Sequence, residues 1–279
     1  MSDGEATTED GRTLHYERHG EGAPVVVCEA GMGLSRNSWG AVVPRVAAST
    51  TIVIYDRSGL GRSAPDPARR DLARLASDLN DLLDQLDPGP FVLVGHSWGG
   101  PIVRRAAARQ PERIVGLVLV DQSDENCDLY FTKAQERQQR FGPAAVSFMG
   151  HSRLLRLVMK RLARPLPEPW ASAMRAEDGT VAAAKEQVAE LDSWSDDLRR
   201  LRDDPLRLPD VPVTVISGGR TGFLERGRRE PLVAAHRATA AAARRGRHVM
   251  AEKSAHYVPL TDPEIVADEI LRVVAIARR

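Results

Sequence analysis

Short apolar runs recur along the 279-residue chain and alternate with segments whose apolar residues return at helical spacing. The runs are rich in valine and isoleucine, too short for helices, and free of alternation between polar and apolar positions. This pattern is typical of strands buried on both faces of a parallel sheet. The predicted strands comprise residues 24–28, 51–55, 91–94, 114–120, 211–217 and 247–252, with a further strand at 12–19 after the hairpin-type turn Asp10-Gly11.

Helical periodicity is clearest at residues 72–86, where leucines return every three or four positions and aspartates occupy the other face. The sequence Thr261-Asp262-Pro263-Glu264 predicts a helix start, because proline is favoured in the first turn, and apolar residues then recur as far as Val274. Strands that alternate with helices predict an α/β fold, in which helices cover both faces of a mostly parallel sheet.

The alternation stops between residues 120 and 211, where about 90 residues show no strand pattern, far more than a usual crossover connection. Helical patterns occur instead at 154–162 and 181–191. A disordered linker is the alternative, but disordered segments are poor in aromatics. This stretch contains Phe131, Phe141, Phe148, Trp170 and Trp194. We therefore expect an α/β core formed by residues 1–121 and 210–279, with a helical cap or lid formed by residues 122–209.

Composition excludes some classes of binding partner but says little about which reaction the protein catalyses. The chain has 39 Lys and Arg against 38 Asp and Glu, and this balance provides no bulk attraction toward nucleic acid or an anionic membrane. The first residues are polar and acidic, and no apolar stretch approaches the roughly 20 residues of a membrane span. We expect a cytoplasmic protein whose partners include neither nucleic acid nor membrane. Of its two cysteines, Cys28 and Cys127, the first ends an apolar run and is interpreted as a buried small hydrophobe.

The strongest chemical signal is Gly-His-Ser-Trp-Gly-Gly at residues 95–100, between a predicted strand and a helical pattern. The pattern G-x-S-x-G in this context predicts a nucleophile elbow. Such a turn forces Ser97 into a strained backbone conformation and leaves no room for Cβ atoms at positions 95 and 99. We expect the Ser97 hydroxyl at the carboxyl edge of the sheet, beside a helix N-terminus that can stabilise negative charge. An ordinary strand–helix turn is the alternative.

A serine nucleophile needs a base, and His256 is the best placed of the seven histidines. It follows the last predicted strand and precedes the final helix, at the same sheet edge as Ser97. His96 lies inside the elbow and His248 within the last predicted strand. His236 falls in an alanine-rich helical pattern, where we expect it to be solvated.

Four motifs in family order make the chain resemble the α/β-hydrolase family over nearly its whole length. They are the turn at 29–33, the Asp-Arg-x-Gly-x-Gly-x-Ser loop at 56–63, the elbow, and the histidine segment at 255–260. The resemblance implies that the backbone N–H groups of Met32 and Trp98 form the oxyanion site. It also implies a reaction that needs neither a metal ion nor an organic cofactor.

The first of these motifs departs from the family, since Glu29-Ala30 stands where histidine is common. Its Gly31-x-Gly33 pair is similar to the start of a dinucleotide-binding fingerprint. That fingerprint requires a third glycine, and the chain has Arg36 at the corresponding position. We therefore reject a dinucleotide site.

The acid of such a triad orients the histidine and stabilises its charged form. In most of the family it follows the penultimate strand, but residues 218–224 contain no carboxylate. Glu225 comes next, in a run of arginines where a solvated ion pair fits better. Some related enzymes, haloalkane dehalogenases among them, place the acid after the preceding strand, and Asp121 stands there. Asp124 and Glu125 remain alternatives.

These residues predict a serine hydrolase that cleaves a carboxylic ester or a related acyl compound, with Ser97 as nucleophile, His256 as base and Asp121 as acid. We expect a small, partly apolar substrate. The pocket could be lined by Phe148, Met149, Trp170, Met174 and Trp194. A lactonase, a C–C bond hydrolase or a cofactor-free perhydrolase is an alternative on the same triad, and a ligand-binding homologue without turnover is another. Dehalogenases and epoxide hydrolases are disfavoured, because they use aspartate as nucleophile.

Overall fold

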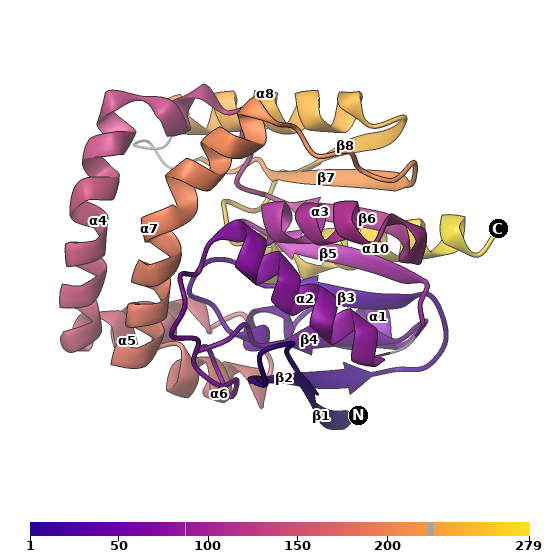
Figure 1. Ribbon diagram of the computed structural model, residues 1–279, viewed down its shortest axis with the longest axis horizontal. Helices are drawn as coiled ribbons and strands as arrows, with labels where there is room; N and C mark the ends of the chain where they lie inside the picture. Colours follow the sequence, from indigo (N-terminus) through magenta and orange to yellow (C-terminus); the bar gives the residue numbers. More distant parts are fainter. Residues whose placement is uncertain (87, 222–225) are drawn as a thin grey trace.

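A computed structural model describes residues 1–86, 88–221 and 226–279 (Figure 1). These residues form an eight-stranded sheet in the order β1-β2-β4-β3-β5-β6-β7-β8. Strand β2 pairs antiparallel with β1 and β4, and all other neighbours pair in parallel. The strands are β1 Ser2–Thr7, β2 Thr13–His19, β3 Val25–Glu29, β4 Ile52–Tyr55, β5 Phe91–His96, β6 Ile114–Val120, β7 Pro212–Gly218 and β8 Arg245–Ala251.

Helices cover both faces of this sheet, α1 and α10 on one face and α2, α3 and α8 on the other (Figure 1). Strands β3, β4 and β5 are buried along their whole length, as expected for strands covered on both sides. The predicted α/β architecture is therefore confirmed. The helices of this part are α1 Val43–Ala47, α2 Leu72–Leu86, α3 Gly99–Arg109, α8 Arg226–Ala242, α9 Val258–Thr261 and α10 Pro263–Ala277, with 3₁₀ helices at Arg36–Trp39 and Pro111–Arg113.

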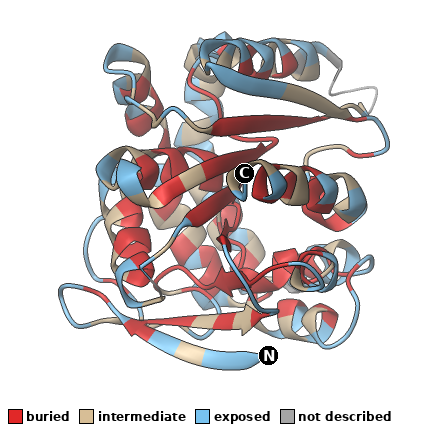
Figure 2. Cartoon of the chain, turned by 90° about the vertical axis from the view of Figure 1, so that its right-hand side faces the viewer, coloured by how far each residue is buried: buried red, intermediate tan, exposed pale blue. Residues whose placement is uncertain are grey.

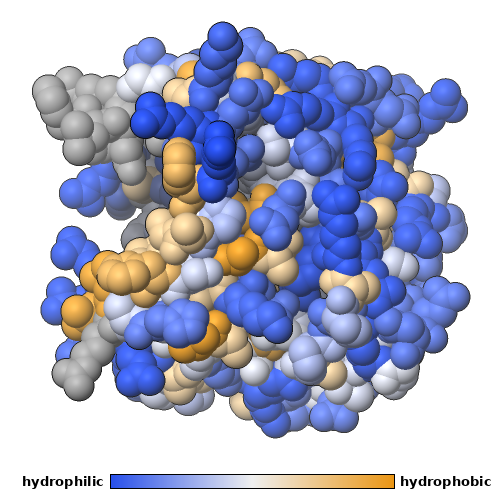
Figure 3. Space-filling model, turned by 60° about the vertical axis from the view of Figure 1, so that its left-hand side comes forward, coloured by the Kyte–Doolittle hydropathy of each residue, from blue (hydrophilic) through white to orange (hydrophobic). Residues whose placement is uncertain are grey.

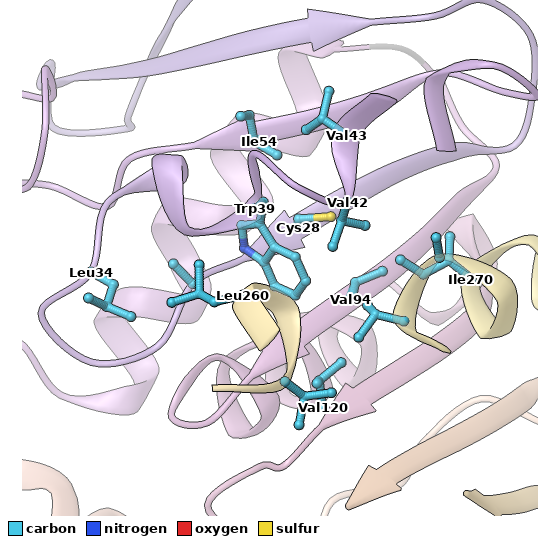
Figure 4. Close-up of a cluster of buried hydrophobic side chains, with 14 of the residues drawn as sticks. Cys28, Leu34, Trp39, Val42, Val43, Ile54, Val94, Val120, Leu260 and Ile270 are labelled. Atoms are coloured by element: carbon cyan, nitrogen blue, oxygen red, sulfur yellow. The ribbon is translucent and has the colours of Figure 1, made fainter. Parts of the chain in front are cut away.

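Apolar side chains on the two faces of the sheet form the core, and buried residues run through the central strands (Figure 2). Figure 4 shows part of the face covered by α1 and α10, where Val94 and Val120 of neighbouring strands lie near Trp39 and Ile270. Cys28 belongs to this cluster and is fully buried. Burial raises the pKa of its thiol, so Cys28 serves packing, as the sequence indicated.

Between β6 and β7 the described chain is helical and contains no strand, as the sequence predicted. Helices α4 and α7 lie side by side at one edge of the molecule (Figure 1). Helix α7 packs on the core through apolar residues of its second half. None of the described helices combines the length and hydrophobicity required to cross a membrane. The helices are α4 Lys133–His151, α5 Arg153–Leu162, α6 Trp170–Glu177 and α7 Val181–Asp203, preceded by a 3₁₀ helix at Asp128–Phe131.

Among the differences from the sequence prediction are the helices α4 and α6, which no clear periodicity indicated, and the elements β1 and α7. Residues 2–7 form an antiparallel edge strand beside β2, which the sequence did not indicate because Ala6 is the one buried residue among mostly polar neighbours. The helix predicted at 181–191 continues to residue 203. Charged residues interrupt the apolar spacing of its second half, although the inward face remains apolar through Trp194, Leu198 and Leu201.

Candidate active site

Ser97 lies in the turn between β5 and α3. Its φ angle is 54°, a left-handed conformation that costs a non-glycine residue about 1–3 kcal/mol. Two of its backbone hydrogen bonds connect it to the end of β6 and the loop that follows. The Ser97 N–H donates to the carbonyl of Val120 at 3.0 Å, and the Ser97 carbonyl accepts from the N–H of Ser123 at 2.9 Å. The serine is therefore fixed at the edge where β5 and β6 end.

Glycines make this turn possible. A Cβ atom on Gly95 would lie 2.4 Å from the carbonyl oxygen of Gly99, a distance that real side chains do not tolerate. A Cβ atom on Gly99 would lie 2.5 Å from the carbonyl oxygen of Glu29 on the neighbouring strand. The first contact is the one expected from the sequence. The second shows that Gly99 lets α3 approach β3, which the local motif did not indicate.

Three loops bring Ser97, His256 and Asp121 together. His256 lies between β8 and α9, with Nε2 3.1 Å from Ser97 Oγ and Nδ1 2.8 Å from Asp121 Oδ2. Asp121 follows β6 directly and has a φ angle of 42°, which aspartate adopts more readily than most residues. The residues selected from the sequence thus meet at the carboxyl edge of the parallel strands.

The two alternative acids make other contacts. Asp124 accepts a hydrogen bond of 2.6 Å from Thr239 Oγ1. Glu125 binds the guanidinium of Arg104 through both carboxylate oxygens. Within the described part of the chain, neither carboxylate is hydrogen-bonded to His256. The geometry therefore favours the carboxylate at position 121.

Asp121 is also bound by Arg229 of α8, whose NH1 lies 2.6 and 2.8 Å from the two carboxylate oxygens, and by the N–H of Gly218 at 2.9 Å. Burial raises the pKa of Asp121, but its hydrogen bonds with His256 and Arg229 and the nearby positive charge lower it by more. The pKa lies well below its usual range, so the carboxylate stays ionised. Nothing in the sequence distinguished Arg229 from the arginines around it. Glu225, the other carboxylate considered, lies outside the described residues.

His96 holds the loop that carries His256. Its Nε2–H donates to the backbone carbonyl of His256 at 2.9 Å, and the two rings lie 5.0 Å apart. Burial lowers the pKa of His96 to about 3, which keeps the ring neutral. The sequence placed His96 in the elbow but gave no sign of this contact, because the two residues are 160 positions apart.

Met32 and Trp98 line the same cavity as Ser97 and His256. Across residues 1–86, 88–221 and 226–279, the backbone N–H of neither residue donates a hydrogen bond to another group. Trp98 immediately precedes α3, where the helix dipole contributes partial positive charge. Both donors are therefore available for an anionic oxygen.

Arg57 fixes the turn that carries Met32. Its guanidinium donates to the carbonyls of Ala30 and Gly31, both at 2.7 Å. A trans peptide points its C=O and the following N–H in opposite directions. Because the Gly31 carbonyl is bound to Arg57, the N–H of Met32 is directed away from Arg57. The sequence identified Arg57 as part of a family loop but not as a support of this turn.

Carboxylates on both sides balance Arg57. Glu29 accepts from its NH1, and Glu190 of α7 accepts from its Nε and NH2, both at 2.9 Å. Arg70 donates to the same Glu190 at 2.7 Å. Burial raises the pKa of Glu29, to which Tyr55 also donates, whereas the two arginines hold the pKa of Glu190 below its usual range despite its burial. This network connects the helical segment to the turn at 29–33.

A cavity of about 500 Å³ opens beside Ser97 and His256. Elements of the core and helices α4 and α7 both contribute to its wall, and the lining combines apolar side chains with a few polar ones. The lining residues besides these two are Met32, Trp98, Ser123, Cys127, Leu129, Tyr130, Gln135, Gln138, Leu191, Trp194, Leu232 and Tyr257.

Of the five side chains expected to line the pocket, Trp194 does so. Phe148 is instead exposed on α4, and Met149 packs against the core cluster. Trp170 lies over Gly40 and Met174 is fully buried in the core. The expectation was wrong for these four, because residue type alone does not tell which side of a helix faces the cavity.

His236 also differs from expectation. It is fully buried rather than solvated, with Nδ1 2.8 Å from Ser217 Oγ and Nε2 2.9 Å from the carbonyl oxygen of Gln122. The alanine-rich face of α8 packs on the sheet, so a polar residue on that face is carried inside and bonded there.

Comparison with known proteins agrees with this fold. Over 108 residues the chain is 34% identical to a protein of Azorhizobium caulinodans provisionally named carbamate hydrolase RutD, a match that covers 39% of this chain and 40% of that protein. The chain therefore spans less than half of that relative. Among solved structures, the epoxide hydrolase CorEH is 19% identical with a TM-score of 0.74 and 99% coverage of both chains. A thermophilic esterase from Thermogutta terrifontis is 20% identical with a TM-score of 0.75 and full coverage of both.

At these identities the two structures demonstrate a shared fold and nothing more. The match to a family is broader. The model of the alpha/beta hydrolase family covers residues 25–269, which include the elbow and His256. The chain belongs to the alpha/beta hydrolase family.

Proposed function

We propose that this protein is a serine hydrolase that cleaves a carboxylic ester, or a closely related acyl compound, through an acyl-enzyme. The observation that carries the proposal is the hydrogen-bonded series from Ser97 Oγ through His256 to Asp121. Serine is a poor nucleophile unless a base takes its proton. Nε2 of His256 is within reach of that proton, while Asp121 binds Nδ1 and so fixes the tautomer.

The reaction follows from these positions. Ser97 Oγ attacks the carbonyl carbon as its proton moves to His256, and negative charge develops on the carbonyl oxygen. The N–H groups of Met32 and Trp98 stabilise that charge. His256 then gives the proton to the leaving alcohol. In the second half, His256 takes a proton from water, the resulting hydroxide attacks the acyl carbon, and the acid leaves as Ser97 regains its proton.

The cavity supports a small and partly apolar substrate. A volume of about 500 Å³ is within the usual range for small-molecule pockets. Leu191, Trp194 and Leu232 offer apolar surface, and the hydroxyl of Ser123 adds a polar group. Because α4 and α7 contribute to the wall, residues 122–209 would act as a cap that shields the acyl-enzyme and shapes specificity.

Related acyl substrates test the breadth of this chemistry. The relative from Azorhizobium caulinodans is named for a carbamate, which also presents a carbonyl carbon to a nucleophile. A lactone is an internal ester and uses the same steps. Epoxide hydrolysis is a weaker hypothesis than ester hydrolysis, because the residue at the elbow is Ser97 rather than a carboxylate.

A fluorophosphonate probe tests the proposal directly. The folded protein should be labelled at Ser97, and Ser97→Ala should remain folded, lose the label, and lose turnover of p-nitrophenyl esters. Lactones and a p-nitrophenyl carbamate in the same panel would define the acyl class. A folded protein that takes no label and turns over no substrate in the panel would contradict the proposal and favour a ligand-binding role.

A further inference from the structure

Helices α4 and α5 expose large apolar side chains on a projecting part of the molecule, where hydrophobic atoms are bordered by hydrophilic ones (Figure 3). Phe148 is 72% exposed and Leu157 is 61% exposed. Of the large apolar side chains exposed among the described residues, all except Met1 and Tyr257 lie on α4, on α5 or at the start of α7. Such clustering marks an interaction surface. We call it the apolar ridge, formed by Phe141, Phe148, Leu154, Leu157, Val158 and Val181.

The ridge is not a side effect of core packing. Helix α5 already buries one apolar stripe, which includes Leu155 and Met159. Leu154, Leu157 and Val158 form a second stripe at spacings of three and four residues, and all three are exposed. A helix that served the core alone would place polar residues at these positions.

Positive charge surrounds the ridge. Helices α4 and α5 together contain seven Lys and Arg and one Asp or Glu, a formal charge of +6 in a chain whose total is +1. The single acid, Glu136, pairs with Arg199 of α7 at 3.0 Å. The exposed acids Asp192 and Asp196 of α7 lie about three and four turns from Val181, at the level of the Phe141 end of the ridge rather than of α5, because α7 runs antiparallel to α4. The described cations of α4 and α5 are all exposed: Lys133, Arg137, Arg140, Arg156, Lys160 and Arg161.

We propose that the apolar ridge docks on an anionic lipid surface. The exposed apolar side chains would enter the boundary between headgroups and acyl chains, while the surrounding lysines and arginines bind lipid phosphates. The near-zero total charge, which argued against a membrane partner, averages this basic surface with an acidic remainder. A symmetric contact between two copies is disfavoured, because it would bring two surfaces of like charge together.

Docking would also orient the proposed active site. Helix α4 bears part of the ridge and contributes Gln135 and Gln138 to the cavity wall. A membrane at the ridge would therefore lie near the part of the cavity built from α4. The docking itself does not depend on the chemistry proposed for Ser97, so the two can be tested separately.

Vesicle co-sedimentation tests the inference on the full chain. At low ionic strength we expect binding to mixed phosphatidylcholine–phosphatidylglycerol vesicles to be at least about tenfold stronger than to pure phosphatidylcholine vesicles, since each surface cation strengthens attachment. Added salt should weaken the binding, because screening shortens the reach of the charges. No binding to the mixed vesicles, or equal binding to both kinds, would overturn the proposal.

Two pairs of substitutions locate the surface. Phe148→Asp with Leu157→Asp removes apolar contacts, and Arg156→Glu with Lys160→Glu reverses two charges. Each pair should reduce vesicle binding at least about tenfold while thermal unfolding stays cooperative. The matched control, Arg109→Glu with Arg207→Glu, makes the same charge change at exposed positions outside α4 and α5 and should leave binding intact.

The results of these experiments distinguish a lipid surface from a second copy of the chain as the partner of the ridge. If the control pair weakens binding as much as the α4–α5 pairs, total charge rather than the ridge is responsible and the proposal fails. It also fails if light scattering finds a dimer that Phe148→Asp with Leu157→Asp dissociates while the protein binds no vesicles. That result would assign the ridge to a second copy of the chain.

Discussion

Two buried networks of charged side chains flank Ser97: the acid side, which contains Asp121, and the oxyanion side, which contains Arg57. They differ in how far solvent reaches them. On the acid side, Asp121 is buried between Arg229 and His256, but the His256 side chain is 41% exposed and faces the cavity. On the oxyanion side, Arg57 and Glu190 have side chains that are only 2% and 0% exposed. A group that exchanges protons with substrate must be reachable. A group that only positions backbone can be sealed inside.

The two networks also differ in charge balance. On the oxyanion side, Glu29 and Glu190 bind Arg57 and Arg70, and Glu186 lies 3.4 Å from Arg70, so carboxylates fully compensate both arginines. On the acid side, Arg229 already compensates Asp121 before His256 is protonated. The oxyanion-side network should therefore matter most for stability, and the acid-side network for turnover. Substitutions in each can test this division.

The largest effect is expected on the acid side. Asp121→Asn should lower kcat for esters by about 10⁴-fold with little change in KM, because the amide no longer favours the required tautomer of His256. Asp124→Asn is the matched control, since Asp124 contacts Thr239 rather than His256. Steady-state kinetics on folded variants would check this. A collapse of kcat in the control, with Asp121→Asn near wild type, would reassign the acid.

The next largest effect is expected when Arg57, the central cation of the oxyanion side, is replaced. Arg57→Met should reduce the free energy of unfolding by about 3–5 kcal/mol, because Glu29 and Glu190 stay buried after losing the cation that they share, and only Tyr55 and Arg70 still bind them. The exposed pair Arg45–Glu264 supplies a control, and Arg45→Met should cost less than about 1 kcal/mol. Urea unfolding measures both. Equal losses would mean that burial of the network is irrelevant to its role.

His96 should make stability depend on pH. Its pKa is lowered to about 3 in the folded chain, below the ordinary value of about 6.5. The unfolded chain therefore binds the proton first, so this contribution is fully present above pH 6.5 and declines as pH falls toward 3. In His96→Gln the decline in unfolding free energy between pH 7 and pH 4 should be smaller by about 1–3 kcal/mol. An unchanged decline would contradict the burial argument.

The same residue should affect turnover modestly. His96→Leu removes the donor to the His256 carbonyl and should lower kcat about tenfold, consistent with one hydrogen bond. His96→Gln retains a donor and should recover part of the loss. If both variants turn over esters like the wild type, the loop of His256 needs no support from His96.

The smallest effect is expected at Arg229. In Arg229→Leu, Asp121 loses a competing cation and favours the protonated form of His256 more strongly. The acid limb of the kcat/KM profile should move to higher pH by about half a unit. A move to lower pH would show that Arg229 supports the charged histidine instead of competing with it.

Features that depend on local sequence pattern could be predicted from the sequence. Apolar runs located most strands, and the strand–elbow–helix context selected Ser97. The order of the final strand and helix selected His256, and the end of a predicted strand offered Asp121. These inferences work because parallel strands bring their carboxyl ends to one edge. The family match and the fold confirm the architecture, while the catalytic roles remain predictions.

Long-range contacts could not be predicted in the same way. Arg57 supports a turn that precedes it by 26 and 27 positions, and His96 binds a carbonyl 160 positions away. Both residues lie in motifs, but neither motif indicates these contacts. Phe148 illustrates a related difficulty, because an aromatic on an amphipathic helix can face a pocket, the core or solvent. Whole-chain charge likewise conceals the local excess of basic residues in α4 and α5.

The role of Ser97 as nucleophile is tested most directly by mass spectrometry of the protein quenched during turnover of p-nitrophenyl acetate. We expect a transient acetyl group on the peptide that contains Ser97, formed with the first burst of p-nitrophenol and absent from Ser97→Ala. Steady turnover with no acetyl group on Ser97, or with the group on another side chain such as Cys127, would contradict it.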